Sequence, residues 1–344
     1  MKKRGLKIAG IIIGIILIIC ISIAAYIYSV VNTGFSIDKT VYIYIDSNRD
    51  YNKLLQDIEQ TAKVQDISNF DNVASWLKYK SNLKVGRYAI KPEMNVLDVV
   101  RLLRSGAQSP VKITFNNIRT KKDLAKRISE QLMIDEVSLF AALDNVQVCE
   151  NFGFTTQTIG AMFIPNTYEL YWDISVDNFL KRMSSEYKNF WNDARLSKAK
   201  AIGLSPVEVS ILASIVEEEC MFTDEYPIVA GLYLNRLNRG QLLQADPTVK
   251  FAVGDFTLRR ILNKHLEIDS PYNTYKYEGL PPGPIRIPSI KGIDSVLNYT
   301  KHDYIFMCAK EDFSGRHNFA KTAYEHGINA AKYRAELNRR RIFN

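Results

Sequence analysis

The sequence contains few of the motifs with which proteins bind metals, nucleotides or redox cofactors. Its four cysteines form no CxxC pair and its four histidines show no HExxH spacing, so neither a thioredoxin-like motif nor a zinc site is predicted. P-loop, GxGxxG and GxSxG motifs are also absent, which argues against nucleotide binding and against a serine hydrolase of that type. We therefore expect no metal and no cofactor.

The chain also lacks a compact basic surface of the kind that binds nucleic acid. Its net charge of +8 comes largely from cations near the start, from Arg339–Arg341 and from thinly spread residues, so nucleic acid is not an expected partner. A mildly basic domain suits an anionic polymer of the cell envelope. With 47% hydrophobic and 11% aromatic residues and no low-complexity segment, the chain can build ordinary cores, which excludes a disordered protein.

One long apolar run, from Ile8 to Val31, is present, and no second run follows it. A membrane-spanning helix needs roughly 20 apolar residues, and the cations that precede the run predict a cytoplasmic N-terminus. We expect a single-pass anchor in the cytoplasmic membrane, with membrane lipid as a partner of this helix and nearly all of the remaining chain on the exported or periplasmic side. The alternative is a cleaved signal peptide, although Ile23–Ala25 is a poor cleavage site and the run exceeds the usual core of about 7–15 residues.

Residue patterns predict an α+β fold in five parts. These are a cytoplasmic tip (1–7), the transmembrane helix (8–31), a stalk (32–38), a small α+β module (39–116) and a larger, mainly helical domain with a small β component (117–344). In the small module we expect strands at 41–45, 86–90 and 111–115, and helices around 54–62, around 76–77 and at 96–103, the last closed by Gly106.

The larger domain is predicted to be mostly helical. The expected helices cover residues 121–133, 136–143, 176–194, 206–219 and 224–239, and a terminal helix starts near 322. Residues 163–168 are expected to interrupt the helices, and 279–284 to form a Pro/Gly-rich loop. Residues 304–309 read as a buried strand with 317–319 as its neighbour.

The helix predicted at 206–219 begins clearly and ends unusually. Ser205 can cap it, Pro206 suits its first turn and Glu208 completes a capping box. The helix then ends in three acids, Glu217–Glu219, which oppose the negative end of the helix macrodipole. A solvated acidic helix end is one interpretation; the other is that at least one acid is catalytic, since an apolar face and neighbouring carboxylates can raise the pKa of an acid.

Amide, hydroxyl, acidic and aromatic side chains recur in the segments that follow. Such a mixture suits a sugar site, in which rings stack on aromatics and hydroxyl groups meet amides and carboxylates. Each residue alone can equally be a cap or a turn residue. The candidates for binding glycan or for supporting the catalytic acid are Glu219, Asn235, Gln244, Asp246, Thr248, Tyr272 and Asn273.

These segments together resemble the motif series of the YceG-like (MltG) endolytic murein transglycosylases, in the order of that family. They are LASIVEEE (212–219), NRL (235–237), QADPT (244–248), YNTY (272–275) and GLPPGPI (279–285). FIPNTY (163–168) is similar to the family's PDTY turn, with Asn166 where Asp is usual, and His317–Phe319 with His326 is similar to its C-terminal histidine motif. The loop departs from the usual pattern at Arg286 and Ile287.

The resemblance implies that Glu217 is catalytic and that residues 39–116 form a LysM-like glycan-binding module. A lytic transglycosylase cleaves the MurNAc–GlcNAc bond with the sugar's own C6 hydroxyl group as nucleophile, so one carboxyl group can act first as acid and then as base. The product carries a 1,6-anhydro-MurNAc end. The expected substrate is the murein glycan strand, cleaved internally as it is made, with cell-wall synthases as candidate partners.

Two other functions remain open at this point. The first is a hydrolase of the same glycan that uses two carboxylates, with Glu219 or Asp246 as the second. The second is a non-catalytic, peptidoglycan-binding anchor of the cell-wall synthesis machinery.

Overall fold

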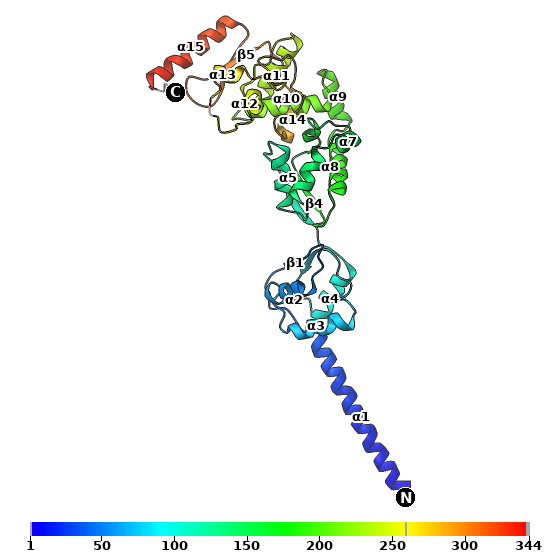
Figure 1. Ribbon diagram of the computed structural model, residues 1–344. Coiled ribbons are helices and arrows are strands. Elements are labelled where there is room, and N and C mark those ends of the chain that lie inside the picture. The colour runs from blue at the N-terminus through cyan, green and yellow to red at the C-terminus, as the bar shows by residue number, and fades with distance from the viewer. Residues whose placement is uncertain (1, 259, 342–344) are drawn as a thin grey trace. The chain divides into compact units, whose positions relative to one another are not determined.

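The computed structural model describes residues 2–258 and 260–341 (Figure 1). About half of the chain is helical, and the described strands pair in two-stranded sheets. The predicted mixture of helices and small sheets is thereby confirmed. The chain folds into two units: unit 1 comprises Met1–Lys112, Gln131–Met133 and Tyr168–Ile174, and unit 2 comprises Ile113–Glu130, Ile134–Thr167 and Ser175–Asn344.

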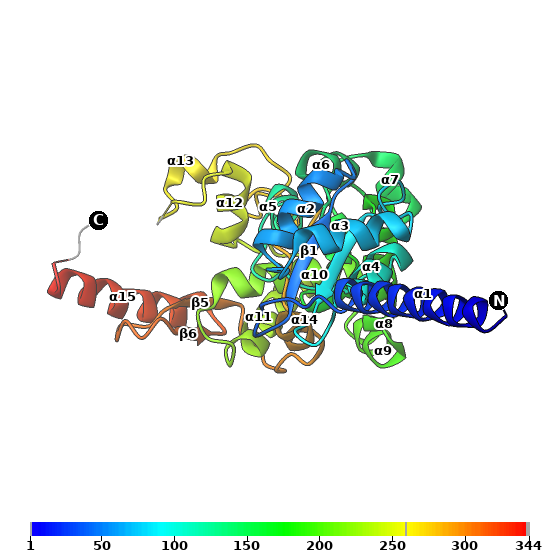
Figure 2. The same ribbon diagram turned by 90° about the horizontal axis from the view of Figure 1, so that it is seen from below.

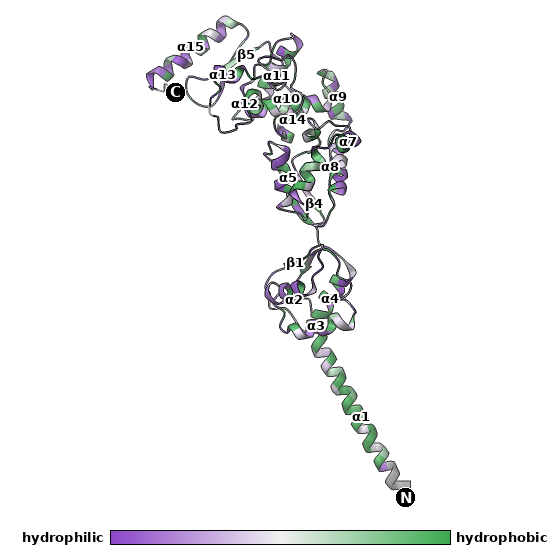
Figure 3. Cartoon of the chain, viewed as in Figure 1, coloured by the Kyte–Doolittle hydropathy of each residue, from purple (hydrophilic) through white to green (hydrophobic). Residues whose placement is uncertain are grey.

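Helix α1 (Lys2–Val31) contains the apolar run and is hydrophobic along most of its length (Figure 3). Its isoleucines are exposed. Among the described residues, Lys7–Val31 is the one single helix that is long and apolar enough to cross a membrane. Helices α9 (Asp193–Ala201) and α10 (Pro206–Glu219) meet that test only when joined across a bend of 75°, and α10 lies in a protein core. An exposed helix of this length matches the thickness of a bilayer.

Unit 1 contains a two-stranded antiparallel sheet, in which Val41 lies opposite Ile90. Along β1 (Val41–Ile45), Ile43 and Ile45 are buried while Tyr42 and Tyr44 are exposed, as expected for a strand with one covered face. The partner strand is β2 (Gly86–Ile90), and the helices of the unit are α2 (Tyr51–Gln60), α3 (Ile67–Trp76) and α4 (Val96–Ser105). The predicted strands at 41–45 and 86–90 are confirmed.

Unit 2 is mainly helical. Helix α15 (Ala323–Arg339) packs along the hairpin of β5 (Phe306–Ala309) and β6 (His317–Ala320) near the C-terminal end of the described residues (Figure 2). Strands β3 (Val111–Thr114) and β4 (Thr167–Leu170) pair with each other. The remaining elements are α5 (Lys121–Ser129), α6 (Glu136–Leu143), α7 (Val146–Asn151), a 3₁₀ helix (Ile159–Met162), α8 (Val176–Phe190), α9 (Asp193–Ala201), α10 (Pro206–Glu219), α11 (Tyr226–Asn238), α12 (Asp246–Val253), α13 (Asn263–Leu266), α14 (Ile290–Leu297), β5 (Phe306–Ala309), β6 (His317–Ala320) and α15 (Ala323–Arg339).

The core of unit 2 surrounds α10, in which every residue from Val209 to Glu217 is buried. A helix that is buried on all sides needs partners for its polar side chains. Ser214 has two, because its hydroxyl group donates to the carbonyl oxygen of Ile211 at 2.7 Å and accepts from the backbone N–H of Ile285 at 3.0 Å. This contact ties α10 to the Pro/Gly-rich loop. The helix packs against α9, α11, α12 and α14.

Several predicted elements of unit 2 differ from the observed ones. The helix predicted at 176–194 is interrupted, because α8 ends at Phe190 and Asn192 caps α9. The helix predicted at 121–133 ends at Ser129. The strand predicted to be buried at 304–309 starts at Phe306 and is partly exposed, since its sheet has only two strands. The prediction missed β4, which begins within the expected break at 163–168, as well as α7, α12 and α14.

Candidate active site

The C-terminal end of α10 presents three consecutive carboxyl groups. The helix starts at the predicted capping box, in which the Ser205 N–H donates to Glu208 at 2.7 Å and the Glu208 N–H donates to the Ser205 hydroxyl group at 3.3 Å. It ends at Glu219, after which Cys220 is extended. Successive helical residues point about 100° apart, so each of the three side chains has a different set of partners.

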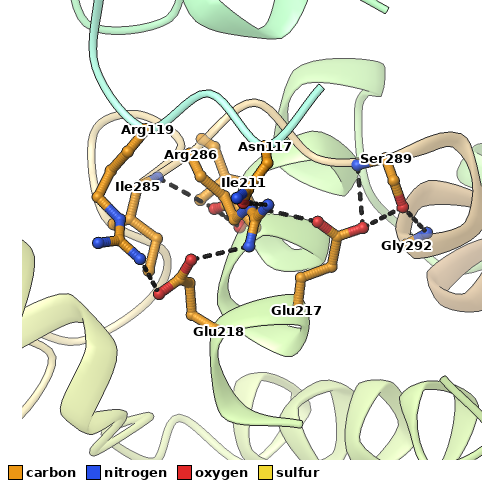
Figure 4. Close-up of polar contacts among 10 residues, drawn as sticks. Asn117, Arg119, Ile211, Glu217, Glu218, Ile285, Arg286, Ser289 and Gly292 are labelled. Atoms are coloured by element: carbon orange, nitrogen blue, oxygen red, sulfur yellow. Dashed lines mark hydrogen bonds and ion pairs between the residues drawn. The ribbon is translucent and has the colours of Figure 1, made fainter. Parts of the chain in front are cut away.

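Glu217 lies at the N-terminus of α14 (Figure 4). Its Oε1 accepts hydrogen bonds from the backbone N–H of Ser289, at 2.9 Å, and from the Ser289 hydroxyl group. That hydroxyl group also caps α14 by accepting from the Gly292 N–H at 3.0 Å. The Glu217 side chain is 4% exposed. A carboxylate at a helix N-terminus is electrostatically favourable, and here it also fixes α14 to the end of α10.

Arg286 closes the other side of the Glu217 carboxylate, with its Nε 3.4 Å from Glu217 Oε2. One of its terminal nitrogens donates to Glu218 at 2.8 Å and the other to the side-chain oxygen of Asn117 at 2.6 Å (Figure 4). Arg119 donates to the second oxygen of Glu218 at 2.6 Å. Two guanidinium groups therefore compensate the charges of Glu217 and Glu218. This set of four side chains, together with Ser289, is called the Arg286 cluster below.

Glu219 points away from that cluster. The Tyr233 hydroxyl group on α11 donates to Glu219 Oε1 at 2.8 Å. Burial raises the pKa of Glu219 to about 7, even though the Tyr233 hydrogen bond acts in the opposite direction. The negative charges of Asp246 and Glu218 raise this pKa further, and Arg236 lowers it. Glu219 is therefore a carboxyl group that can hold a proton near neutral pH and release it there.

The Glu219 carboxyl group lines a polar cavity of about 270 Å³. A second cavity, of about 280 Å³, shares Glu219 and Asp246 with the first and is also lined by Glu218, Lys250 and Arg260. Both cavities are large enough for parts of a sugar chain. The polar and titratable groups around the first cavity are Glu219, Tyr233, Arg236, Gln244, Asp246, Tyr275, Cys308 and His317.

Two predicted glycan-binding residues lie at this cavity beside Glu219. Asp246 is exposed, and its Oδ1 accepts a hydrogen bond from the Tyr275 hydroxyl group at 2.6 Å. Gln244 has a positive φ of 52°, an unfavourable conformation for a residue with a side chain. Its backbone N–H donates to the Thr274 carbonyl oxygen at 3.0 Å, and its side-chain oxygen accepts from Arg236 at 3.2 Å. The amide group is thus held at the cavity wall.

Four other predicted residues lie elsewhere. Asn235 donates to the carbonyl oxygens of His302 and Tyr304, at 2.7 and 3.0 Å. Asn273 donates to the carbonyl oxygens of Leu266 and Ile268, at 2.9 and 2.8 Å. These two amides and the buried Thr248, which contacts Thr274 at 2.8 Å, tie the polypeptide together around the cavity. Tyr272 lines a separate cavity of about 300 Å³ that Arg119, Phe251 and Arg286 also line.

Several residues of the site were not among the predicted ones. Arg236, Tyr275 and His317 fall inside the motifs quoted above, so the motif series contained a signal for them. Tyr233 had a weaker signal, its i, i+3 spacing from Arg236 on one helix. No pattern identified Ser289 or Arg119 as partners of the acids. Within residues 2–258 and 260–341, no group of three or more His, Cys, Asp or Glu side chains is placed to hold a metal ion.

Comparison with known proteins shows the family of the chain. A Bacillus subtilis (strain 168) protein named endolytic murein transglycosylase is 30% identical over 281 residues, which cover 76% of this chain and 77% of that protein. A Streptococcus pneumoniae (strain R6) protein of the same name is 27% identical over 292 residues, covering 75% of this chain and 52% of that protein.

The fold has a counterpart among solved structures. The crystal structure of a YceG-like protein from Listeria monocytogenes superposes with a TM-score of 0.55 and 24% identity, covering 84% of this chain and 99% of that one. The sequence profile of the YceG-like family matches residues 43–332. The chain therefore belongs to the YceG-like family.

Proposed function

We propose that this protein is a membrane-anchored lytic transglycosylase that cleaves MurNAc–GlcNAc bonds within murein strands. Membership of the YceG-like family and the name shared by the Bacillus and Streptococcus relatives support this activity. The observation that carries it in the structure is Glu219, a carboxyl group with a pKa of about 7 that lines a polar cavity with an amide, two tyrosines and a second carboxylate. Amides, hydroxyl groups and carboxylates are the groups that bind sugar hydroxyls.

One carboxyl group can perform both proton transfers of this reaction. Glu219 donates its proton to the glycosidic oxygen as the bond from that oxygen to C1 of MurNAc breaks. The C6 hydroxyl group of the same MurNAc then forms the new bond to C1 and gives its proton to the Glu219 carboxylate. The products are a free GlcNAc hydroxyl group and a 1,6-anhydro-MurNAc end, and Glu219 is protonated again. Tyr233 orients the carboxyl group by donating to Oε1, which leaves Oε2 for the proton.

The geometry favours Glu219 over Glu217, the acid that the family resemblance suggested. Both Glu217 oxygens face donors, with Ser289 at one and Arg286 at the other, and its side chain is almost fully buried. A glycosidic oxygen can reach it only after Arg286 moves. Glu219 needs no such movement, because it already lines a cavity. We therefore assign proton transfer to Glu219 and the fixing of α14 to Glu217.

The assignment is tested with the full-length protein in detergent and purified glycan strands, whose products are followed by mass spectrometry. Glu219→Gln keeps size and shape but removes the titrating proton, and anhydro-product formation should fall by about 10²–10⁴-fold. Glu217→Gln should reduce stability more than turnover. The assignment fails if Glu219→Gln turns over normally, and a collapse of activity in a folded Glu217→Gln protein would restore Glu217 as the acid.

A two-carboxylate hydrolase is the second candidate, and one observation favours keeping it: Asp246 lines the same two cavities as Glu219. A retaining or inverting glycosidase uses a second carboxylate as nucleophile or as base for water. The two reactions differ in product mass, because the anhydro product is one water lighter. A hydrolytic product from the wild-type protein would show that the protein is a hydrolase and would contradict the transglycosylase proposal. Full cellular function of an inactive Glu219→Gln protein would instead favour the non-catalytic anchor.

The proposal also covers the location of the protein in the cell. Helix α1 supports insertion in the cytoplasmic membrane, and the cations before it favour a cytoplasmic N-terminus with the catalytic unit exported. There the enzyme would meet nascent strands and, as candidate partners, cell-wall synthases. A reporter fused after Asn344 should be active only outside the cytoplasm; activity inside would overturn this topology.

We also propose that the LysM-like module of residues 39–116 binds glycan without cleaving it. A variant that lacks these residues, with α1 retained, should cleave the same bonds but bind sacculi more weakly. Unchanged binding to sacculi would contradict this role.

A further inference from the structure

Asp246 is the negatively charged neighbour of Glu219 whose charge is least compensated. Both carboxyl groups line the same two cavities, and α12, which Asp246 begins, packs against α10. The other acidic neighbour, Glu218, is paired with Arg119 and Arg286. Asp246 takes part in none of the ion pairs among the described residues, and its Oδ1 accepts from the neutral Tyr275 hydroxyl group at 2.6 Å.

Arg236, the cation that lowers the pKa of Glu219, is hydrogen-bonded to the backbone. Arg236 donates to the backbone carbonyl oxygens of Leu242, Leu243 and Ile305 at 3.0, 2.9 and 2.7 Å. Its guanidinium group is therefore held by backbone carbonyl oxygens and forms no ion pair with either carboxylate among the described residues. The titratable and charged groups that face Glu219 or line its two cavities are Glu218 and Cys220 at the end of α10, Tyr233 and Arg236 on α11, Asp246 and Lys250 on α12, Arg260 and Tyr275 in the loops, Cys308 on β5 and His317 on β6.

We propose that Asp246, held in place by the Tyr275 hydroxyl group, is a positioning residue that keeps the proton on Glu219 until the glycosidic oxygen takes it. The reason is electrostatic. A fixed negative charge beside a carboxyl group disfavours a second negative charge there, and in this pair Glu219 is the member whose pKa burial raises, whereas Asp246 is exposed. Burial raises the pKa of Tyr275, so its hydroxyl group remains a donor to Asp246. This inference rests on the proposed role of Glu219 as the acid.

The test uses the full-length protein in detergent and two readouts. The first is the titration midpoint of the Glu219 carboxyl group, followed by ¹³C NMR of labelled glutamate and assigned with Glu219→Gln. The second is the pH profile of kcat/KM for anhydro-product formation from glycan strands. Asp246→Asn should lower the midpoint by roughly one pH unit, and the loss of kcat/KM should grow as the pH rises. Tyr275→Phe should shift the midpoint in the same direction by less, and Asp246→Glu should restore it.

A matched control exists in the same region of the chain. The Tyr277 hydroxyl group donates to Asp269 Oδ1 at 2.5 Å, and neither residue lines the two cavities. Asp269→Asn should therefore leave the midpoint unchanged. An unmoved midpoint in Asp246→Asn, or an equal shift in Asp269→Asn, would overturn the inference. So would loss of cleavage by Asp246→Asn at every pH, since Asp246 would then act on the reacting atoms.

Failure of this inference can be told apart from failure of the proposed function. If Glu219→Gln abolishes cleavage but Asp246→Asn leaves the titration midpoint of Glu219 unchanged, Glu219 is the acid and Asp246 has no positioning role. If Asp246→Asn shifts the midpoint but Glu219→Gln still cleaves glycan, the two carboxyl groups are electrostatically coupled and Glu219 is not the acid.

Discussion

The two sides of the α10 end show how one helical turn can place similar side chains in opposite roles. On one side, the Arg286 cluster surrounds Glu217 and Glu218 with donors and leaves their charges compensated. On the other side, Glu219 has a single hydrogen-bond donor, Tyr233, and a negatively charged neighbour, Asp246. A paired carboxylate keeps its charge and holds structure together, whereas an uncompensated one can exchange a proton. The contrast lies in the partners, because the three side chains are chemically identical.

Breaking the Arg286 cluster should have the largest effect on stability. Arg286→Met removes the cation between two nearly buried carboxylates, and the free energy of unfolding should fall by about 3–4 kcal/mol, the scale for breaking one partner of a buried ion pair. Chemical denaturation in detergent measures it. Arg127→Met, which breaks an exposed ion pair with Glu130 at 3.6 Å, is the control and should cost under about 1 kcal/mol. Similar costs for both would show that the cluster does not stabilise the fold.

Glu219→Gln should change stability in the opposite direction. The folded state binds more protons than the unfolded state between the ordinary value of 4.5 and the raised pKa of about 7, so the wild type loses stability as the pH rises through that range. The variant has no such loss. Above pH 7 it should be more stable than the wild type by up to roughly 3 kcal/mol. Parallel stability curves from pH 4 to 8 would contradict the raised pKa.

Gly292→Ala tests the Glu217 side without touching a charge. A Cβ atom at this position would lie 2.2 Å from Glu217 Oε1, so either the carboxylate or the start of α14 must shift. We expect a loss of about 1–3 kcal/mol, as for overpacked cores, with an unchanged titration midpoint of Glu219. A large loss of cleavage at full stability would indicate that Glu217, and not Glu219, performs the chemistry.

Thr248→Val should have the smallest effect. It removes the hydroxyl group that donates to the Ala245 carbonyl oxygen at 2.7 Å and keeps nearly the same volume. The expected cost is about 1 kcal/mol, with the length distribution of the cleaved glycan unchanged, because Thr248 is fully buried. A changed product pattern would mean that Thr248 contributes to glycan binding more directly than its contacts suggest.

Local signals predicted the elements that carry the site, because those signals are contained in neighbouring residues. The capping box at Ser205 predicted the start of α10 and the three acids after its apolar run predicted the end, while an apolar run at 304–309 predicted the first strand of the C-terminal pair. Helix α14 was missed although Ser289 caps it and Ile290, Ile293 and Val296 recur at helical spacing. The predicted Pro/Gly-rich loop ended at residue 284, and no element was assigned to the residues that follow it.

The sequence could not predict which acid would face which partner. Three consecutive acids are equivalent in a pattern, and their surroundings depend on how α10 is rotated against α14 and the loop at 279–287. The contacts that decide it join residues far apart in the sequence, such as Arg119 with Glu218 and Ser289 with Glu217. Asn235 and Asn273 illustrate the same limit, since an amide that ties two backbone segments looks no different in a sequence from one that binds a sugar.

The single-turn spacing of the three acids also constrains how the protein can evolve. Deleting or inserting one residue in α10 before Glu217 would turn each acid by about 100°, placing it in the surroundings of its neighbour. Such a change would disturb both the Arg286 cluster and the cavity at Glu219. The protein should therefore tolerate substitutions within this helix far better than insertions or deletions. Glu218 is paired with Arg119 and Arg286, and Arg286 also lies 3.4 Å from Glu217. A substitution at Arg286 would therefore change the charge balance of both Glu217 and Glu218, while the hydrogen bond between Tyr233 and Glu219 would remain.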